Sequence, residues 1–238
     1  MTNATIKLIF SHADFYIIDK PAGIGVHKDD QHQGILPVLC QQLGEDKLWL
    51  VHRLDKITSG LLILARNAAA AAHFGELFSQ RQVQKYYLAV CGKKPNKKQG
   101  TVIGDMQPAR NGQWKLTQDK NNPAISQFFS QGLIDGKRLI VVKPCTGKTH
   151  QIRVMLKSVG APILGDERYG GEQADRTYLH AYGLIFHYQN SLIEVYCPPT
   201  NGEYFQPLQD ESLWHSFQQP QQLPWPTLPT SLMHKALT

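Results

Sequence analysis

The sequence has no long apolar run and no sign of an export signal. The strongly apolar run at residues 61–65 is far shorter than the roughly 20 residues that a transmembrane helix needs. The first residues lack a basic stretch followed by a long apolar stretch and a small-residue cleavage site, which a secretory signal would carry. We therefore expect a cytoplasmic protein with no membrane partner.

Cysteine is scarce, and no two cysteines form a CxxC pair. The four cysteines lie far apart, at Cys40, Cys91, Cys145 and Cys197. This spacing is typical of neither a zinc knuckle nor a redox dithiol, so we expect buried free thiols. His52 and His150 have no third metal ligand at a suitable spacing, and we expect no metal.

Charge of one sign is in excess, whereas the rest of the composition is ordinary. The 238 residues include 42% hydrophobic and 18% charged residues, values that exclude a disordered chain, a collagen-like fibre and a coiled coil. The 25 Lys and Arg residues exceed the 19 Asp and Glu residues, which leaves a net charge of +6. This positive charge favours a polyanionic partner such as nucleic acid. A chain of this length forms either one large domain or two small ones.

Hydrophobic periodicity predicts an α+β fold. Residues 68–79 are expected to form a helix with Asn67 as its N-cap, and a second helix is expected to begin at Thr149 and to end at Gly160. The expected strands are residues 7–10, 15–19, 61–65, 83–90, 125–129 and 139–142, with a hairpin of residues 184–188 and 192–196. Gln and Pro accumulate from Gln206 onward, and the stretch at residues 218–226 cannot sustain regular structure, so the last residues are expected to form an appended tail. It is either flexible or docked by Trp214, Phe217 and Trp225.

Ionisable residues are most concentrated in residues 51–60. Asp55 lies between Arg53 and Lys56, and these cations favour its ionised form, which suits a nucleophile better than a general acid. The alternative is that Asp55 accepts hydrogen bonds from Thr58 or Ser59 in a turn. Spacing alone does not decide between the two.

The strand expected at residues 83–90 places consecutive tyrosines on opposite faces. A period of two puts Tyr87 on the side of Lys85 and Ala89, and Tyr86 on the side of Leu88.

Six segments, in order along the chain, resemble the motifs of RluA-type RNA pseudouridine synthases, which isomerise uridine in ribosomal or transfer RNA. They are Asp19–His27, His52–Leu62, Lys85–Ala89, Thr146–Val154, Gly160–Gly170 and Leu179–Ala181. The resemblance covers roughly residues 10–200, and several ordered matches are far more specific than any one motif. Two positions depart from the usual pattern: Lys148 replaces an arginine, and Met155 stands where a histidine is frequent.

The resemblance implies the roles of the candidate catalytic residues. Asp55 would be the essential catalytic carboxylate, Tyr87 the residue against the target base, and Arg153 the partner of the aspartate. Arg53 would fill the space left by the flipped base. The other expected RNA-binding residues are His52, Lys85, Lys148 and His150, and both histidines can equally be structural.

The resemblance also implies the architecture. We expect a mixed, mostly antiparallel central sheet with flanking helices and a central active-site cleft. Residues 1–205 would form the catalytic domain and residues 206–238 the tail. Only about ten residues precede the first match, so no N-terminal S4-like RNA-binding domain is expected.

The implied reaction is an isomerisation, so we expect no cofactor, and no protein partner is predicted. Asp55 could attack C1′ or C6, or take the C2′ proton; the sequence leaves these open. Candidate phosphate contacts, each of which could equally be a solvated surface cation, are Arg81, Lys93, Lys94, Lys97, Lys98 and Lys148. The rival interpretations are a catalytically inactive RNA-binding or RNA-chaperone protein on the same fold and a metal-dependent nuclease.

Overall fold

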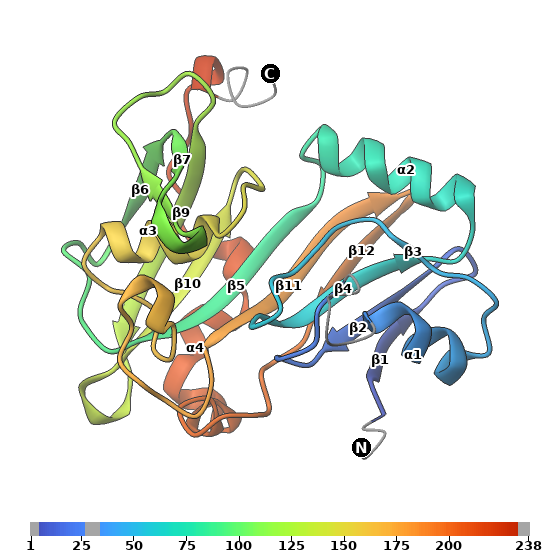
Figure 1. Ribbon diagram of the computed structural model, residues 1–238, viewed down its shortest axis with the longest axis horizontal. Coiled ribbons are helices and arrows are strands. Elements are labelled where there is room, and N and C mark those ends of the chain that lie inside the picture. The colour runs from blue at the N-terminus through green and yellow to red at the C-terminus, as the bar shows by residue number, and fades with distance from the viewer. Residues whose placement is uncertain (1–4, 27–33, 233–238) are drawn as a thin grey trace. The chain divides into compact units, whose positions relative to one another are not determined.

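The computed structural model describes residues 5–26 and 34–232, and the chain divides into two compact units (Figure 1). The first unit combines Met1–Val83 with His180–Cys197, and the second combines Gln84–Leu179 with Pro198–Thr238. His27, the last residue of the first matching motif, lies outside the described residues.

The first unit is built on a mixed sheet. Its strands run in the order β1 (Lys7–Ser11), β2 (Phe15–Lys20), β4 (Ser59–Ala65) and β11 (Leu179–Tyr188), with β12 (Ser191–Tyr196) on β11 and β3 (Trp49–Leu50) on β4. β4 pairs with β11 in parallel, whereas the other pairs are antiparallel. All residues of β4 are buried, as expected for a continuous apolar run in a sheet covered on both faces.

Two helices belong to this unit, α1 (Ile35–Leu43) and α2 (Ala68–Ser79). α2 has the bounds and the cap that the sequence predicts, because Asn67 Oδ1 accepts the Ala70 N–H at 2.8 Å. Its buried face packs on β3 and β4, and Phe74 meets the Phe15 ring edge-on at 5.1 Å between centroids. α1 is an element that the sequence analysis did not predict.

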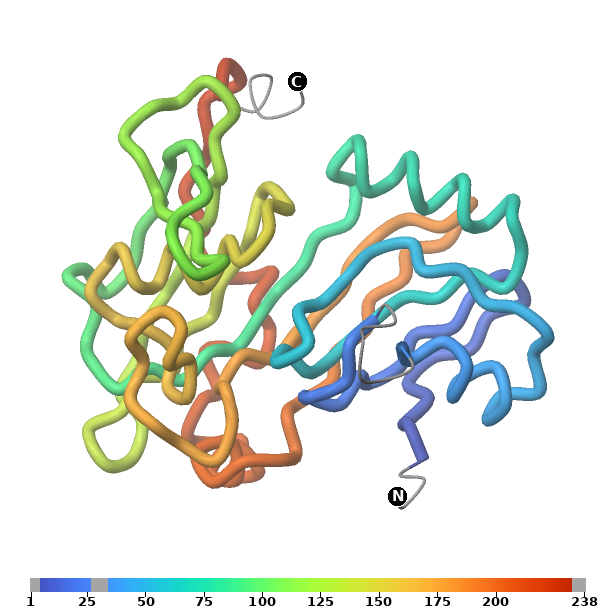
Figure 2. Tube along the Cα trace, in the orientation of Figure 1, coloured from blue at the N-terminus to red at the C-terminus, as the bar shows by residue number. Residues whose placement is uncertain are grey.

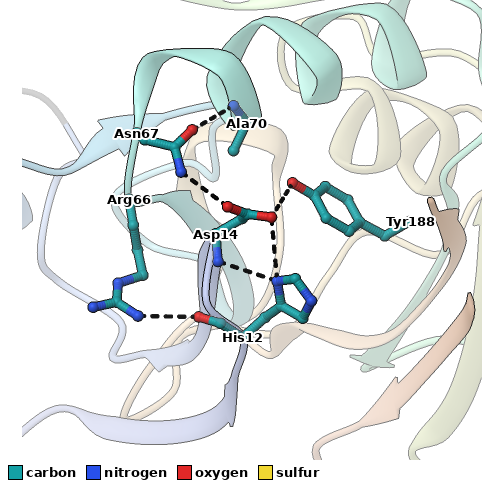
Figure 3. A network of polar contacts seen from close by, with 6 residues as sticks. All are labelled: His12, Asp14, Arg66, Asn67, Ala70 and Tyr188. Atoms are coloured by element: carbon teal, nitrogen blue, oxygen red, sulfur yellow. Dashed lines mark hydrogen bonds and ion pairs between the residues drawn. The ribbon is translucent and has the colours of Figure 1, made fainter.

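A polar network joins the start of α2 to the turn between β1 and β2 (Figure 3). Asp14 accepts hydrogen bonds from the Asn67 amide at 3.0 Å and from the Tyr188 hydroxyl at 3.1 Å. Burial and the bond to Asp14 raise the pKa of Tyr188 to about 12. Asn67 therefore both caps α2 and attaches it to the sheet.

The second unit has an antiparallel sheet. Its strands run in the order β5 (Gln84–Cys91), β10 (Arg138–Pro144), β9 (Ala124–Gly132) and β6 (Gln99–Gly104). A separate hairpin joins β7 (Met106–Pro108) and β8 (Trp114–Leu116), and single 3₁₀ turns lie at Arg110–Gly112, Ile134–Gly136 and Glu167–Tyr169. Among the described residues of this unit, the longest helix is α3 (Gln151–Ser158).

α3 does not begin as the sequence predicts. Its N-cap is His150, which has a left-handed backbone (φ 57°) and makes no side-chain capping bond. Thr149 is therefore not the cap. The prediction at the other end is confirmed, because the helix stops at Val159 and Gly160 follows with φ +80°.

The C-terminal segment is docked on the second unit. It forms short turns, η4 (Gln206–Gln209), η5 (Glu211–Trp214), α4 (His215–Gln218) and η6 (Pro220–Gln222), along the orange and red part of the chain in Figure 2. Trp214 and Phe217 are buried, and the Trp225 ring lies edge-on to Phe129 at 4.8 Å. Of the two predicted alternatives, a flexible or a docked segment, the docked one is therefore confirmed. The domain boundary at residue 205 stays a prediction.

The two faces of the second sheet are covered by different elements. On β9, Gln127 and Phe129 contact Pro226 and Trp225 of the C-terminal segment, whereas Ser126 accepts a hydrogen bond from Gln151 of α3. Within residues 5–26 and 34–232, no helix is long and apolar enough to cross a membrane.

Replacing Trp214 tests the docking of the C-terminal segment. Its side chain is 2% exposed, and its Nε1 donates to the Leu208 carbonyl at 2.8 Å. Trp214→Ala is expected to lower the free energy of unfolding by about 3–5 kcal/mol, measured by urea denaturation. The control is Leu213→Ala, because Leu213 is 44% exposed and its loss should cost under about 0.5 kcal/mol. If Trp214→Ala and Leu213→Ala unfolded at the same urea concentration, this result would contradict the docking of the segment.

Candidate active site

Asp55 lies on the loop that connects β3 to β4. The Thr58 N–H donates to the Asp55 carbonyl at 3.0 Å, so the backbone itself closes this turn. Leu54 is buried and anchors the loop, whereas the Asp55 side chain is half-buried and its neighbours Arg53 and Lys56 are exposed. The loop thus presents one carboxylate at the protein surface between two cations.

A buried lysine holds this loop against the end of β2. Lys20 is fully buried, and its Nζ donates to the carbonyls of Pro21 at 2.8 Å, Ile24 at 2.9 Å and Lys56 at 3.4 Å. An ammonium group has three N–H donors, and these three carbonyls can receive them. Because Lys56 follows Asp55 directly, this contact helps to fix the backbone beside the carboxylate. The sequence analysis missed Lys20, although it ends a buried strand within a matching motif.

The other end of the loop is fixed to β11. Ser59 Oγ lies 2.8 Å from His180 Nδ1, and His180 Nε2 lies 2.8 Å from the Cys197 carbonyl. Gly60 has φ +109°, and a Cβ there would lie 2.3 Å from the Ala181 carbonyl oxygen, so only glycine permits this approach of the strands. Both ends of the Asp55 loop are therefore immobilised within the first unit.

One group of residues in the described part of the chain could offer metal ligands. Atoms of Asp19, His180 and Cys197 all lie within 4.8 Å of one another. However, both ring nitrogens of His180 already have hydrogen-bond partners. Burial and the neighbouring Asp19 raise the pKa of the Cys197 thiol to about 12. The arrangement suits a hydrogen-bonded cluster better than a metal site. The sequence analysis considered only His52 and His150 for such a role.

Tyr87 lies on β5 with Lys85 on the same face of the strand. Tyr87 pairs with Val142 of β10 and is half-buried, whereas Tyr86 is 1% exposed on the opposite face. The predicted division of the two tyrosines is confirmed. Tyr87 shares its face of the sheet with Phe128 and Ser126, which is the face that α3 contacts.

A single buried amide organises the turn before α3. Gln151 Nε2 donates to the Ile125 carbonyl at 3.0 Å and to Ser126 Oγ at 2.9 Å. Its Oε1 accepts from Thr146 Oγ1 at 2.7 Å and from the Lys148 N–H at 2.9 Å. The amide thus uses its full hydrogen-bonding capacity and connects the motif at 146–154 to β9. The amine of Lys148 itself donates to Asn122 Oδ1.

Arg153 is held by a buried ion pair with Asp166. Nε contacts Oδ2 at 2.7 Å and Nη2 contacts Oδ1 at 2.8 Å, and both side chains are at most 5% exposed. The guanidinium also lies over the Tyr169 ring, 4.7 Å from its centroid. The resemblance implies that Arg153 contacts the catalytic Asp55. Within the second unit, Arg153 forms its ion pair with Asp166. The contact between Arg153 and Asp55 stays a prediction.

The two histidines proposed to contact RNA make structural contacts. His52 Nε2 accepts the Ile63 N–H at 2.8 Å, and its ring stacks on Phe78 at 4.7 Å. His150 Nδ1 lies 2.8 Å from the Tyr169 hydroxyl. The sequence analysis considered an RNA-binding role and a structural role for each histidine, and these contacts agree with the structural role.

The candidate residues are divided between the two units. His52, Arg53 and Asp55 belong to the first unit, and the second unit contains Lys85, Tyr87, Lys148, His150 and Arg153. Their meeting in one central cleft stays a prediction.

Comparisons with known proteins agree with the motifs. A model of the RNA pseudouridylate synthase family matches residues 14–158. An uncharacterised RNA pseudouridine synthase of Haemophilus influenzae is 54% identical over 202 residues, which cover 84% of this chain and 90% of that protein. Ribosomal large subunit pseudouridine synthase C of Rickettsia bellii is 32% identical over 193 residues, or 76% of this chain and 64% of that protein.

Solved structures show the same fold. Human RNA pseudouridylate synthase domain containing 4 has a TM-score of 0.67 and 27% identity, over 84% of this chain and 90% of that one. Human RNA pseudouridylate synthase domain containing 1 has a TM-score of 0.73 over 100% and 96% of the two chains, and at 22% identity it supports the fold alone.

Fold and motifs together define an isomerase that acts on RNA. The chain belongs to the RNA pseudouridylate synthase family, and its motifs are those of the RluA type.

Breaking the buried ion pair tests what fixes Arg153. Asp166→Asn leaves the guanidinium buried without its counter-charge, and it is expected to lower the free energy of unfolding by about 3–5 kcal/mol, measured by urea denaturation. Glu167→Gln is the matched control, since Glu167 is the exposed neighbour and its change should stay within about 0.5 kcal/mol. If both variants unfolded at the same urea concentration, the pair would not hold Arg153.

Proposed function

We propose that this chain isomerises uridine in structured ribosomal or transfer RNA, with Asp55 as the catalytic carboxylate. The observation that carries the proposal is the presentation of Asp55. Its side chain is half-buried on a loop that Lys20 holds on one side and the Ser59–His180 contact holds on the other. A reactive group on a fixed loop keeps its geometry through turnover, which is what positioning for catalysis requires.

The reaction rearranges bonds within one nucleotide. The N1–C1′ bond breaks, the C5–C1′ bond forms, C5 loses a proton and N1 gains one, so atoms and electrons balance without a redox partner. Asp55 can attack C1′ or C6, or remove the C2′ proton, and each route uses an ionised carboxylate.

The proposal assigns the other candidate residues to binding and positioning. Tyr87 would stack on the target uracil and relay the C5 proton, and its half-exposed position on β5 leaves the ring accessible. Arg153, which Asp166 immobilises, would orient Asp55. Lys85 and Lys148 would contact phosphates, and His52 and His150 would shape the RNA-facing loops.

The target uridine must leave the base stack, because C1′ and C5 are shielded in stacked RNA. Extruding a base costs a few kcal/mol, which new contacts with the protein must offset. Arg53 is exposed next to Asp55 in the sequence and would fill the vacated space.

The relative from Rickettsia bellii, whose name refers to the large ribosomal subunit, supports ribosomal RNA over transfer RNA as the substrate. Such a substrate also agrees with a cytoplasmic location.

Removing the carboxylate tests the central assignment. Asp55→Ala is expected to reduce tritium release from C5-labelled uridine in unmodified RNA by about 10²–10⁴-fold or more. RNA binding should persist, because one carboxylate adds no attraction for a polyanion. The matched control is Asp46→Ala, at an exposed aspartate, which should release tritium at the wild-type rate.

The same assay names the substrate when ribosomal and transfer RNA are fractionated. If Asp55→Ala released tritium at the wild-type rate, the assignment of Asp55 as the catalytic carboxylate would be wrong. Binding without release by the wild-type chain would favour the inactive RNA-binding alternative.

Replacing Tyr87 separates stacking from proton transfer. Tyr87→Phe keeps the ring but loses the hydroxyl, so kcat is expected to fall about 10²-fold or more while KM changes little. Tyr86→Phe is the matched control. Tyr86 lies on the opposite face of the strand and its hydroxyl donates to Gln84 at 2.9 Å, so the kcat of this variant should remain within about twofold of wild type. A wild-type kcat for Tyr87→Phe would exclude an essential proton relay through this hydroxyl.

A further inference from the structure

The loop between β5 and β6 concentrates positive charge. We call residues 92–98 the lysine loop. It contains Lys93, Lys94, Lys97 and Lys98 and no acidic residue, and all four lysines are exposed. Among the described residues, no ion pair engages any of these four amines. The loop therefore presents four exposed cations to solvent, of which Lys93 also interacts electrostatically with the Glu172 carboxylate.

The lysine loop is held in place by its central residues. Pro95 is buried, and the Asn96 N–H donates to the Val159 carbonyl at the end of α3 at 2.9 Å. The Lys98 carbonyl accepts the Ser130 N–H of β9 at 2.7 Å. Two pairs of lysines thus flank an anchored dipeptide, so binding an anion requires ordering only the side chains.

The charges around the loop strengthen the patch. The carboxylate of Glu172, which lies beside Gly92, is already paired with Lys137 at 2.7 Å. Lys157, near the end of α3, is exposed and adds a further cation. A surface of this charge attracts a polyanion at long range.

The lysine loop begins where β5, the strand that carries Tyr87, ends, and Lys93 lies six residues along the chain from Tyr87. Because an extended chain rises about 3.3 Å per residue, the loop is displaced along the strand direction from the residue proposed to meet the target base. The loop also contains no aromatic residue, so it has no platform on which unpaired bases could stack. Lysine amines contact phosphates without reading sequence, and double-stranded RNA is recognised mainly by shape and by its backbone.

We infer that the lysine loop binds the phosphate backbone of a double-stranded stem of the RNA substrate, away from the target uridine. This inference rests on the proposed function, and it adds that the enzyme recognises a stem next to the modified site. It separates the protein into a region that performs the chemistry and a region that supplies affinity.

The experiment compares two variants of equal charge. The loop variant is Lys93→Gln, Lys94→Gln, Lys97→Gln and Lys98→Gln together. The control variant is Lys7→Gln, Lys47→Gln, Lys115→Gln and Lys120→Gln, which removes four exposed lysines elsewhere. The probes are an RNA duplex of G·C pairs and a single-stranded oligocytidine, neither of which contains uridine.

The loop variant is expected to bind the duplex at least about tenfold more weakly at low salt, with the slope of log K against log salt concentration smaller by about 4, one for each lost phosphate contact. The control variant should change duplex affinity by less than about threefold. If both variants lost the same duplex affinity, the inference would be overturned, because the overall positive charge of the protein would then explain binding. A loss of oligocytidine binding as large as the loss of duplex binding would also overturn the inference.

Turnover separates this inference from the proposed function. With an unmodified large-subunit ribosomal RNA transcript, the loop variant is expected to have a higher KM for tritium release and an unchanged kcat. Absence of release by the wild-type chain from both ribosomal and transfer RNA transcripts would contradict the proposed function. Unchanged duplex binding by the loop variant would overturn the inference about the lysine loop alone.

Discussion

The arrangement of the candidate site depends on one physical constraint: a polar group removed from water must find a full set of partners. Lys20 meets it with three backbone carbonyls, one of them beside Asp55. Gln151 meets it with four hydrogen bonds that join the turn before α3 to β9. Because an unsatisfied buried donor or acceptor costs about 1–3 kcal/mol, each contact strongly penalises any displacement of its loop. The loops that contain the candidate residues are thereby ordered by polar contacts, while apolar packing orders the strands between them.

Local signals in the sequence predict the elements whose stability is itself local. α2 has the predicted bounds because its cap, Asn67, and its apolar face lie within one stretch of chain. α1 has no such signal. Its N-cap is Gly34 without a side-chain bond, it contains Pro37, and only Ile35 and Leu39 are buried, so tertiary packing decides its conformation. The Thr149 cap fails for a related reason, since His150 adopts a left-handed backbone that propensity does not foresee.

Partners that are distant in sequence could not be predicted from it. Arg153 pairs with Asp166 and Ser59 meets His180 only because the fold brings separate segments together. Asp55 and Asp166, two of the aspartates in the matching motifs, differ chiefly in their surroundings. Asp166 is 2% exposed and paired with a guanidinium, whereas Asp55 is half-buried on a surface loop. Composition cannot distinguish a structural carboxylate from a reactive one; the motif resemblance suggests which is which, and burial gives the physical reason.

The C-terminal segment explains how neighbouring tyrosines acquire different roles. Trp225 covers the face of the second sheet that contains Tyr86, and Lys143 lies 5.7 Å from the centroid of the Trp225 ring. Burial there lowers the pKa of Lys143. Tyr87 occupies the other face and stays half-exposed. Because a strand alternates its side chains with a period of two, covering one face with the segment leaves Tyr87 on the opposite face of the second sheet, the face that α3 contacts.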